Sequence, residues 1–326
     1  MARSFRWYVV KKVAYLALTI FLILTFNFIL FRVMPGDVAR IVIPKNATPE
    51  TLDHLRHYYG LDKSPVEQYF MYLGQLFTGH LGESISFQTG WQIQDFLGSY
   101  LVNTMILVGF GTILSIAVGI WLGRFTAWNR GRAPDRIGSA FFLVFYCMPT
   151  FLFALAMLTL TAKVVPQWPI AGAYSPTYYT MDFVSQMGDR VVHTLLPLFA
   201  LVIETIATFS IITRSALIDV MTEEYMVTAV AKGLRGRDVL RRHAMPNAML
   251  PVVTVIAMNV GWVLSGSIMI EMIFSYQGLG YLTYYAVTSQ DYPLLQATFM
   301  LEAVAVVIAN FIADLMLLRL DPRVRV

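Results

Sequence analysis

Six long apolar stretches divide this sequence of 326 residues and restrict its fold more than any other feature. They lie at about 10–31, 102–123, 138–162, 194–213, 250–273 and 296–318. Each is close to the length of a helix that crosses a bilayer, about 20 residues. Hydrophobic residues make up 57% of the chain and charged residues 13%, which is too much apolar surface for a soluble domain to bury. The sequence therefore predicts an all-α polytopic membrane protein with six transmembrane helices.

The first apolar stretch follows a basic N-terminus and could be mistaken for a signal peptide. Its apolar run is too long for such a peptide, and no small-residue cleavage site follows before Arg32. We therefore expect a retained first span. This gives four regions: a cytoplasmic start with the first helix (1–32), an extracytoplasmic insert (33–100), the core transmembrane domain (101–318) and a cytoplasmic tail (319–326).

Lysine and arginine residues are distributed unevenly between the two sides of these spans. The pieces 1–12, 124–137, 214–246 and 319–326 hold 17 of the 24 basic residues, whereas the pieces between them on the other side hold 7. Because basic residues are enriched in cytoplasmic loops, both termini are expected in the cytoplasm. The basic residues are dispersed along membrane flanks, so the net charge of +4 indicates no nucleic-acid partner.

The insert at 33–100 is the longest soluble piece and has its own helix signals. Thr48, Pro49 and Glu50 resemble a helix start, with Gly60 as its stop. A second amphipathic helix is expected over about 65–77. Two interpretations remain open, namely a folded cap that packs on the membrane helices and a docking surface for an external partner.

A basic segment at 223–251 lies between the fourth and fifth spans. Glu223 and Glu224 favour a helix start, because acids are stabilised at the positive end of the helix dipole. Ala229 and Ala231 are small enough for a partner to approach closely, and Gly233 is expected to end the helix. A second, arginine-rich helix would follow. An ordinary cytoplasmic loop would explain the arginines but not the length and the Ala/Gly/Pro spacing.

The order of alanine, glycine and proline in this segment resembles the pattern EAA-x3-G-x9-I-x-LP of permeases in binding-protein-dependent ABC importers. The resemblance extends along the chain to the B-type permeases of the dipeptide, oligopeptide and nickel importers. It rests on Met34–Asp37, Tyr59–Lys63, Gln68–Tyr69, Gly79–Ser84, Asp135–Arg136, Met148–Phe151, Thr228–Leu234, Glu271–Gly280 and Leu320–Arg325. Val227, His243, Gln277 and His80 depart from the family pattern, so individual contacts do not carry over at these positions.

This resemblance implies a type I importer fold in a bacterial or archaeal inner membrane. Two permeases would pair there, and the second is expected to be a distinct paralogue of this chain. Two ATP-binding subunits would dock on residues 223–251, which we call the coupling segment, within the loop 214–249. An extracytoplasmic binding protein would deliver the solute, di- or oligopeptides by this resemblance. The implied contact residues are Glu224, Thr228, Ala229, Ala231, Lys232, Gly233, Arg235, Arg237 and Pro246.

The residues themselves support a non-catalytic role for this chain. No G-x4-G-K-[ST] phosphate-binding loop occurs, so ATP is expected on the partner subunits and no cofactor on this chain. The single cysteine, Cys147, excludes an intrachain disulfide. His54 and His57 have a spacing that could hold a metal, but a solvated helix face is the favoured interpretation.

Acidic residues inside the apolar stretches are costly unless they face water or a partner. Glu204 in the fourth span and Glu302 in the sixth are candidate pathway-lining residues, for example opposite a peptide amine. The alternative is a hydrogen-bonded packing residue at each position. Asp314 is expected to pair with Arg319, and Glu271 lies toward the outer end of the fifth span.

Two alternatives to a peptide importer remain open from the sequence. Within the same family, the solute could be an oligosaccharide, nickel or another small molecule. In a different class, the chain could be a stand-alone, ion-coupled secondary carrier that uses its intramembrane acids to move protons. Inverted repeats or paired broken helices would favour the carrier.

Overall fold

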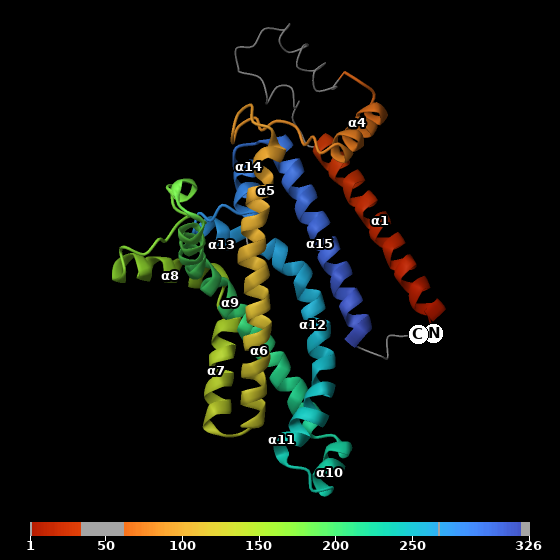
Figure 1. The fold of residues 1–326 in the computed structure, drawn as a ribbon, viewed down its shortest axis with the longest axis vertical. Helices are drawn as coiled ribbons and strands as arrows, with labels where there is room; N and C mark the ends of the chain where they lie inside the picture. The colour runs from red at the N-terminus through yellow and green to blue at the C-terminus, as the bar shows by residue number, and fades with distance from the viewer. Residues whose placement is uncertain (1, 34–61, 267, 321–326) are drawn as a thin grey trace. The chain divides into compact units, whose positions relative to one another are not determined.

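The computed structural model describes residues 2–33, 62–266 and 268–320 (Figure 1). These residues are mostly helical, and in this part of the chain the only strand-like pairing is an isolated bridge between Glu83 and Gln92. The chain divides into two compact units, residues 1–102 with 278–308 and residues 103–277 with 309–326.

The first unit is built from helices at both ends of the chain. They are α1 (Ala2–Val33), α4 (Pro65–Phe77), most of α5 (Ile93–Thr104), α14 (Leu279–Thr288) and the first part of α15 (Tyr292–Leu320). Buried side chains of α5, α14 and α15 form its core, among them Ile93, Leu282 and Leu294, each fully buried.

Helix α4 confirms the amphipathic helix expected over 65–77. Ser64 and Glu67 form a capping box: Ser64 Oγ accepts from the Glu67 amide, and the Glu67 carboxylate accepts from the Ser64 amide at 3.0 Å. The bond from the Ser64 amide holds the pKa of Glu67 below its ordinary value. The other helix predicted for this insert, at 48–59, lies outside the described residues.

A fully buried carboxylate fixes the turn-rich segment that follows α4. Asp291, in the turn between α14 and α15, accepts a hydrogen bond from Ser84 Oγ at 2.6 Å. The same carboxylate oxygen accepts from the backbone amides of Ile85, Ser86 and Phe87 at 2.9–3.2 Å. Because a buried charge needs this many donors to offset its lost hydration, Asp291 determines the path of residues 84–87.

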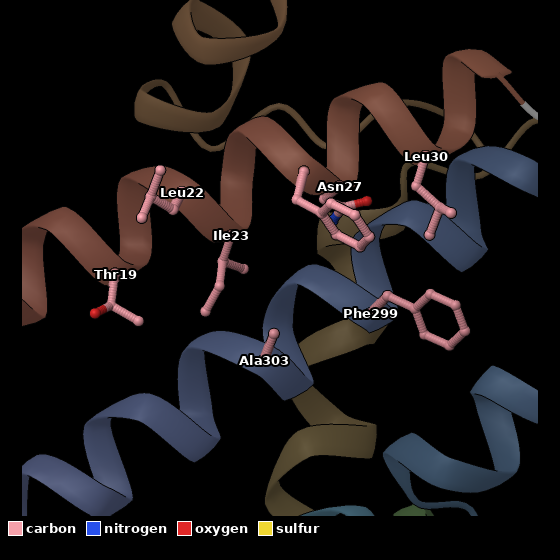
Figure 2. A pocket seen from close by; sticks show the side chains of 8 residues that line it. Thr19, Leu22, Ile23, Asn27, Leu30, Phe299 and Ala303 are labelled. Atoms are coloured by element: carbon pink, nitrogen blue, oxygen red, sulfur yellow. The ribbon is translucent and has the colours of Figure 1, made fainter.

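Helices α1 and α15 also line an apolar cavity of about 460 Å³ in the first unit (Figure 2). Ile23 of α1 and Ala303 of α15 face one another across it. Asn27 donates to the Gln296 carbonyl at 3.1 Å, and within the described residues its buried Oδ1 has no hydrogen-bond partner. Both helices are candidate membrane spans, and the side chains that line the cavity are mostly apolar.

The second unit contains the remaining helices. In chain order they are η1 (Met105–Gly109), α6 (Phe110–Trp128), α7 (Ala133–Cys147), α8 (Thr150–Val164), η2 (Tyr178–Thr180), α9 (Phe183–Met221), α10 (Glu224–Ala231), α11 (Gly236–Val239), η3 (Leu240–Ala244), α12 (Met245–Gly266) and α13 (Ile268–Ile273). The elements η1 and η3 are single turns of π-helix inside longer helices, and η2 is a 3₁₀ turn.

Helices α6 and α9 pack closely because α6 presents four small residues at intervals of four: Gly111, Ser115, Gly119 and Gly123. All four are buried. A Cβ atom built on Gly119 would lie 2.5 Å from Phe209 Cβ, and one built on Gly123 would lie 2.6 Å from the Ser210 carbonyl oxygen. Small residues at this spacing let two helix backbones approach without side chains between them, as is typical of membrane helices.

The apolar stretch predicted as the span 138–162 is not one straight helix. It consists of α7 and α8, which meet at 99° (Figure 1). Met148 is extended (φ −81°, ψ 125°), because a residue before proline avoids helical geometry, and Pro149 lacks the N–H that would continue the hydrogen-bond ladder. The break therefore has a local cause that can be read in the sequence, whereas its angle depends on packing.

Four described helical stretches are long and apolar enough to cross a membrane: 9–31, 93–128, 183–221 and 292–312. They contain or overlap the predicted spans at 10–31, 102–123, 194–213 and 296–318. The bent α7–α8 pair is a fifth candidate. The predicted span 250–273 coincides with α12 and α13, which flank residue 267, outside the described residues. The chain is thus a multi-pass membrane protein.

Candidate functional site

The coupling segment begins directly after the long helix α9. That helix ends at Met221, Thr222 caps it, and α10 starts at Glu224 after an extended Glu223 (φ −71°, ψ 146°). Glu224 lies in the first turn of α10 and is exposed. The acid at a helix start, predicted from the dipole, is therefore confirmed, and only two residues separate α10 from α9.

One face of α10 is buried against the protein itself. Met226 and Ala229 are each 5% exposed and belong to a cluster with Val239 and Leu240 of the following turns. The same cluster contains Leu217 of α9 and Ala127 of α6. This apolar contact packs the segment against α6 and α9.

Gly233 ends α10 as the sequence predicted. Its φ of +77° lies in the left-handed region, where residues with a Cβ are strained. Its amide donates to the Val230 carbonyl at 2.9 Å, and the Lys232 amide donates to the Thr228 carbonyl at 3.1 Å. No atom lies within 4 Å of a Cβ built on Gly233, so the backbone angle and not crowding requires glycine here.

The rest of the segment is largely exposed, with apolar side chains such as Val227 and Val230 on α10 and basic ones from Lys232 onward. Eight of the nine predicted contact residues are exposed: Glu224, Thr228, Ala231, Lys232, Gly233, Arg235, Arg237 and Pro246. The exception is Ala229, whose burial means that its small side chain serves the packing of α10. The expectation that Ala229 lets a partner approach closely is therefore corrected, while Ala231 remains available for such a contact.

Two anchoring contacts in the second unit were not recognised as such in the sequence. Asp135 of α7 forms a bidentate ion pair with Arg214 of α9, with Nε–Oδ1 at 2.6 Å and Nη2–Oδ2 at 3.0 Å. Asp135 is 4% exposed and also accepts from the Gly131 amide at 2.8 Å. The second anchor is Trp128, whose ring lies 3.1 Å from a Cβ built on Gly236 at the start of α11. The residues of the ion pair lie 79 positions apart, so no local pattern indicates it.

The two candidate pathway acids each have a hydroxyl partner in the structure. Glu204 is half-buried near the middle of α9 and accepts a hydrogen bond from Thr150 Oγ1, at the start of α8. Glu302 of α15 accepts from Thr283 Oγ1 of α14 at 2.8 Å. These contacts agree with the packing alternative at both positions. Glu204 belongs to the second unit and Glu302 to the first.

The remaining sequence candidates have structural partners or lie outside the described residues. Glu271 of α13 is fully buried and accepts from Thr104 Oγ1 at 2.8 Å. Asp314 has an interaction partner, but the side chain of Arg319 is outside the described set, as are His54 and His57. Among the described residues there is no group of three or more His, Cys, Asp and Glu residues that could hold a metal.

Comparisons with known proteins agree over the whole chain. Residues 115–326 match the family described as binding-protein-dependent transport system inner membrane component, and residues 5–117 match the N-terminal family of the same systems. The dipeptide transport system permease protein of Lactococcus lactis subsp. cremoris is 31% identical over 98% of this chain and 99% of its own length.

Two further relatives and one solved structure are similar. The di/tripeptide transport system permease protein of Pseudomonas aeruginosa is 30% identical, covering 98% of both chains. The glutathione transport system permease protein of Escherichia coli O6:H1 is 28% identical over 98% of both. An inward-facing methionine ABC transporter structure, MetNI, shares the fold, with a TM-score of 0.54 and 16% identity over 70% of this chain and 98% of that one. The chain therefore belongs to the family of inner membrane components of binding-protein-dependent transport systems, as a permease subunit of an ABC importer.

Proposed function

We propose that this chain forms half of the passage through which an ATP-driven importer takes up di- and oligopeptides. The relatives at about 30% identity carry dipeptide and di/tripeptide transport in their names and match almost end to end. A second, related permease would supply the other half of the passage, and an extracytoplasmic binding protein would deliver the peptide.

Six spans with both termini in the cytoplasm complete the proposed topology. The fifth candidate is the bent α7–α8 pair, and α12 with α13 would be the sixth. The excess of basic residues at 1–12, 124–137, 214–246 and 319–326 supports a cytoplasmic position for these pieces and an external one for residues 33–100.

The exposed face of the coupling segment carries the proposed interaction with the ATPase subunits. Its α10–Gly233–α11 hairpin buries Met226, Ala229 and Val239 on one side and presents Lys232, Arg235 and Arg237 on the other. One side of the hairpin is therefore packed against the rest of the chain, and the other side is accessible to a partner. Two ATP-binding subunits, which supply the nucleotide site that this chain lacks, would dock there, one on each permease.

The proposed mechanism is alternating access, in which the passage opens to one side of the membrane at a time and the α10–α11 hairpin transmits the movement. Closure of the ATPases around ATP would shift α10 and α11, and the buried contacts to α6 and α9 would pass the movement to the membrane helices. ATP can change the balance between inward- and outward-facing states only through contacts that differ between those states. The exposed face of the coupling segment is the described surface on which such contacts would form.

Copurification tests this proposal. A tagged chain expressed from its native locus is expected to bring down ATP-binding subunits and a second permease, and the assembly in proteoliposomes should take up radiolabelled trialanine with ATP. Reversing the charge of Arg235 and Arg237 together should release the ATPases while leaving the chain in the membrane. Arg136→Glu, an exposed arginine of α7 outside the segment, is the matched control. A chain that transports trialanine without ATPases would refute the proposal and favour a secondary carrier.

A further inference from the structure

A half-buried arginine near the start of α9 lies beside a pair of tyrosine rings, and within the described residues it has no acidic partner. The guanidinium carbon of Arg190 lies 5.0 Å from the ring centre of Tyr178 and 5.5 Å from that of Tyr174. Arg190 Nε donates to the Tyr178 hydroxyl at 2.7 Å, and Nη1 donates to Asn103 Oδ1 at 3.3 Å. Each of these groups belongs to the second unit.

Arg190 retains unused binding capacity. Within the described part of the chain its hydrogen bonds are the two just given, so three of its five N–H donors have no protein acceptor. The adjacent carboxylate of Asp189 is directed elsewhere, since it accepts from the Ser175 amide at 2.8 Å and lies 3.4 Å from His193 Nδ1. By contrast, Arg214 on the same helix donates through Nε and Nη2 to both oxygens of the Asp135 carboxylate.

The partners of Arg190 are themselves fixed. Asn103 is 1% exposed, and its amide donates to the Gln277 carbonyl at 2.7 Å, which directs Oδ1 toward Arg190. The Gln277 side chain accepts from the Ala173 amide, and the Gly172 amide donates to the Phe274 carbonyl at 2.9 Å. The loop that carries Tyr174 and Tyr178 is therefore tied to the rest of the unit, and the guanidinium is held in place before any ligand arrives.

A planar guanidinium with free N–H groups is suited to a carboxylate, which it can bind through two parallel hydrogen bonds. The guanidinium is half-buried beside the two tyrosine rings, so water screens its attraction for an anion less than it would for a fully exposed arginine. We propose that Arg190 binds the carboxylate of the transported solute, which is the C-terminal carboxylate if the solute is a peptide. This inference rests on the proposed function and makes the permease itself selective for free-acid peptides.

The position of Arg190 along the chain fits this role. It lies eight residues into α9, in the piece 163–193 that the distribution of basic residues assigns to the external side. A solute that leaves a binding protein would reach this end of the second unit before it reached Glu204, about two turns beyond Pro197. A purely structural arginine that only fastens the 172–178 loop is the competing explanation.

Transport of a free-acid peptide and its amide separates these two explanations. The complete importer is reconstituted in proteoliposomes with its binding protein, and the uptake of trialanine is compared with that of trialanine amide at saturating concentrations of each loaded binding protein. The wild type is expected to favour the free acid by about tenfold, the usual effect of a hydrogen bond to a charged group. Arg190→Gln should bring this ratio close to one. Because one binding protein serves every variant, its own selectivity cancels when ratios are compared.

Asp189→Asn is the matched control, since it disturbs the other contact between α9 and the same loop without touching the guanidinium. It is expected to keep the wild-type ratio. A uniform loss of both substrates in Arg190→Gln, or an equal loss of preference in Asp189→Asn, would overturn the inference. So would a wild type that transports acid and amide equally. A wild type that transports neither tripeptide would instead refute peptide import itself, and this carboxylate site with it.

Discussion

Replacing Gly123 with alanine is expected to destabilise the pair formed by α6 and α9. The new Cβ would lie 2.6 Å from the Ser210 carbonyl oxygen, 2.7 Å from Thr213 Cβ and 3.1 Å from the Arg214 amide nitrogen. Two of these atoms belong to the backbone and the third is a β-carbon, so none can rotate away. The helices must separate, and the contacts on both sides of the glycine are lost with the close approach.

The size of the effect follows from two opposing contributions. Crowding in a closely packed interior costs about 1–3 kcal/mol. Alanine in place of glycine gains about 1 kcal/mol in helix propensity, which offsets part of that cost. Because the clash at Gly123 involves backbone atoms, we expect the upper part of the range and a net destabilisation of about 1–2 kcal/mol.

Gly188 provides a control in α9 itself. No atom lies within 4 Å of a Cβ built there, so Gly188→Ala gains helix propensity without crowding. The two variants are therefore expected to shift stability in opposite directions. Purified protein in detergent is heated, and the fraction that remains monodisperse is measured by size-exclusion chromatography. If Gly123→Ala were as heat-resistant as Gly188→Ala, the close approach of α6 and α9 would not be what stabilises this unit.

Three further perturbations test other contacts. Asp135→Leu should lower the free energy of unfolding by about 3 kcal/mol, because it leaves Arg214 unpaired. Adding Arg214→Met should restore most of that loss in the same heating assay. If stability does not recover in the double variant, the ion pair is not the cause of the loss. Asp291→Ala should increase amide hydrogen exchange at residues 85–87, whose donors it leaves unsatisfied, and unchanged exchange would show that the carboxylate does not hold this turn. Hydrogen bonds from Ser185 hold the pKa of Asp182 below its ordinary value. A lowered folded-state pKa contributes stability above the unfolded-state pKa and loses it as the pH falls, so exchange in the first turn of α9, corrected for its intrinsic pH dependence, should rise below about pH 4. Asp182→Asn should remove this pH dependence, and a rise that persisted in that variant would point to another titrating group.

Much of the helical framework could be predicted because it depends on local physics. Runs of apolar residues predicted the long helices, and the glycine at position 233 predicted the end of α10. Ser64 with Glu67 and the amphipathic pattern beyond them correspond to α4. In each case the deciding interactions lie within a few residues of one another, so the sequence pattern contains them.

The remaining features depend on residues that are far apart in the sequence. The Asp135–Arg214 pair joins two helices, and the 99° angle between α7 and α8 is set by what each packs against. Glu204 could not be assigned its Thr150 partner without knowing where α8 turns. Ala229 is the clearest example, because periodicity alone does not show whether a small residue faces its own protein or a partner.

Helix α9 has a consequence for how force crosses the membrane. Its 39 residues make a rod of roughly 58 Å, nearly twice the thickness of the hydrocarbon layer. One end holds Arg190 and the loop around it, and the other end leads within two residues into α10. In the proposed importer, α9 would therefore act as one continuous strut between the entrance of the passage and the surface on which the ATPases push. Pro197 interrupts its hydrogen-bond ladder about one third of the way along, and this is where such a strut would bend under load.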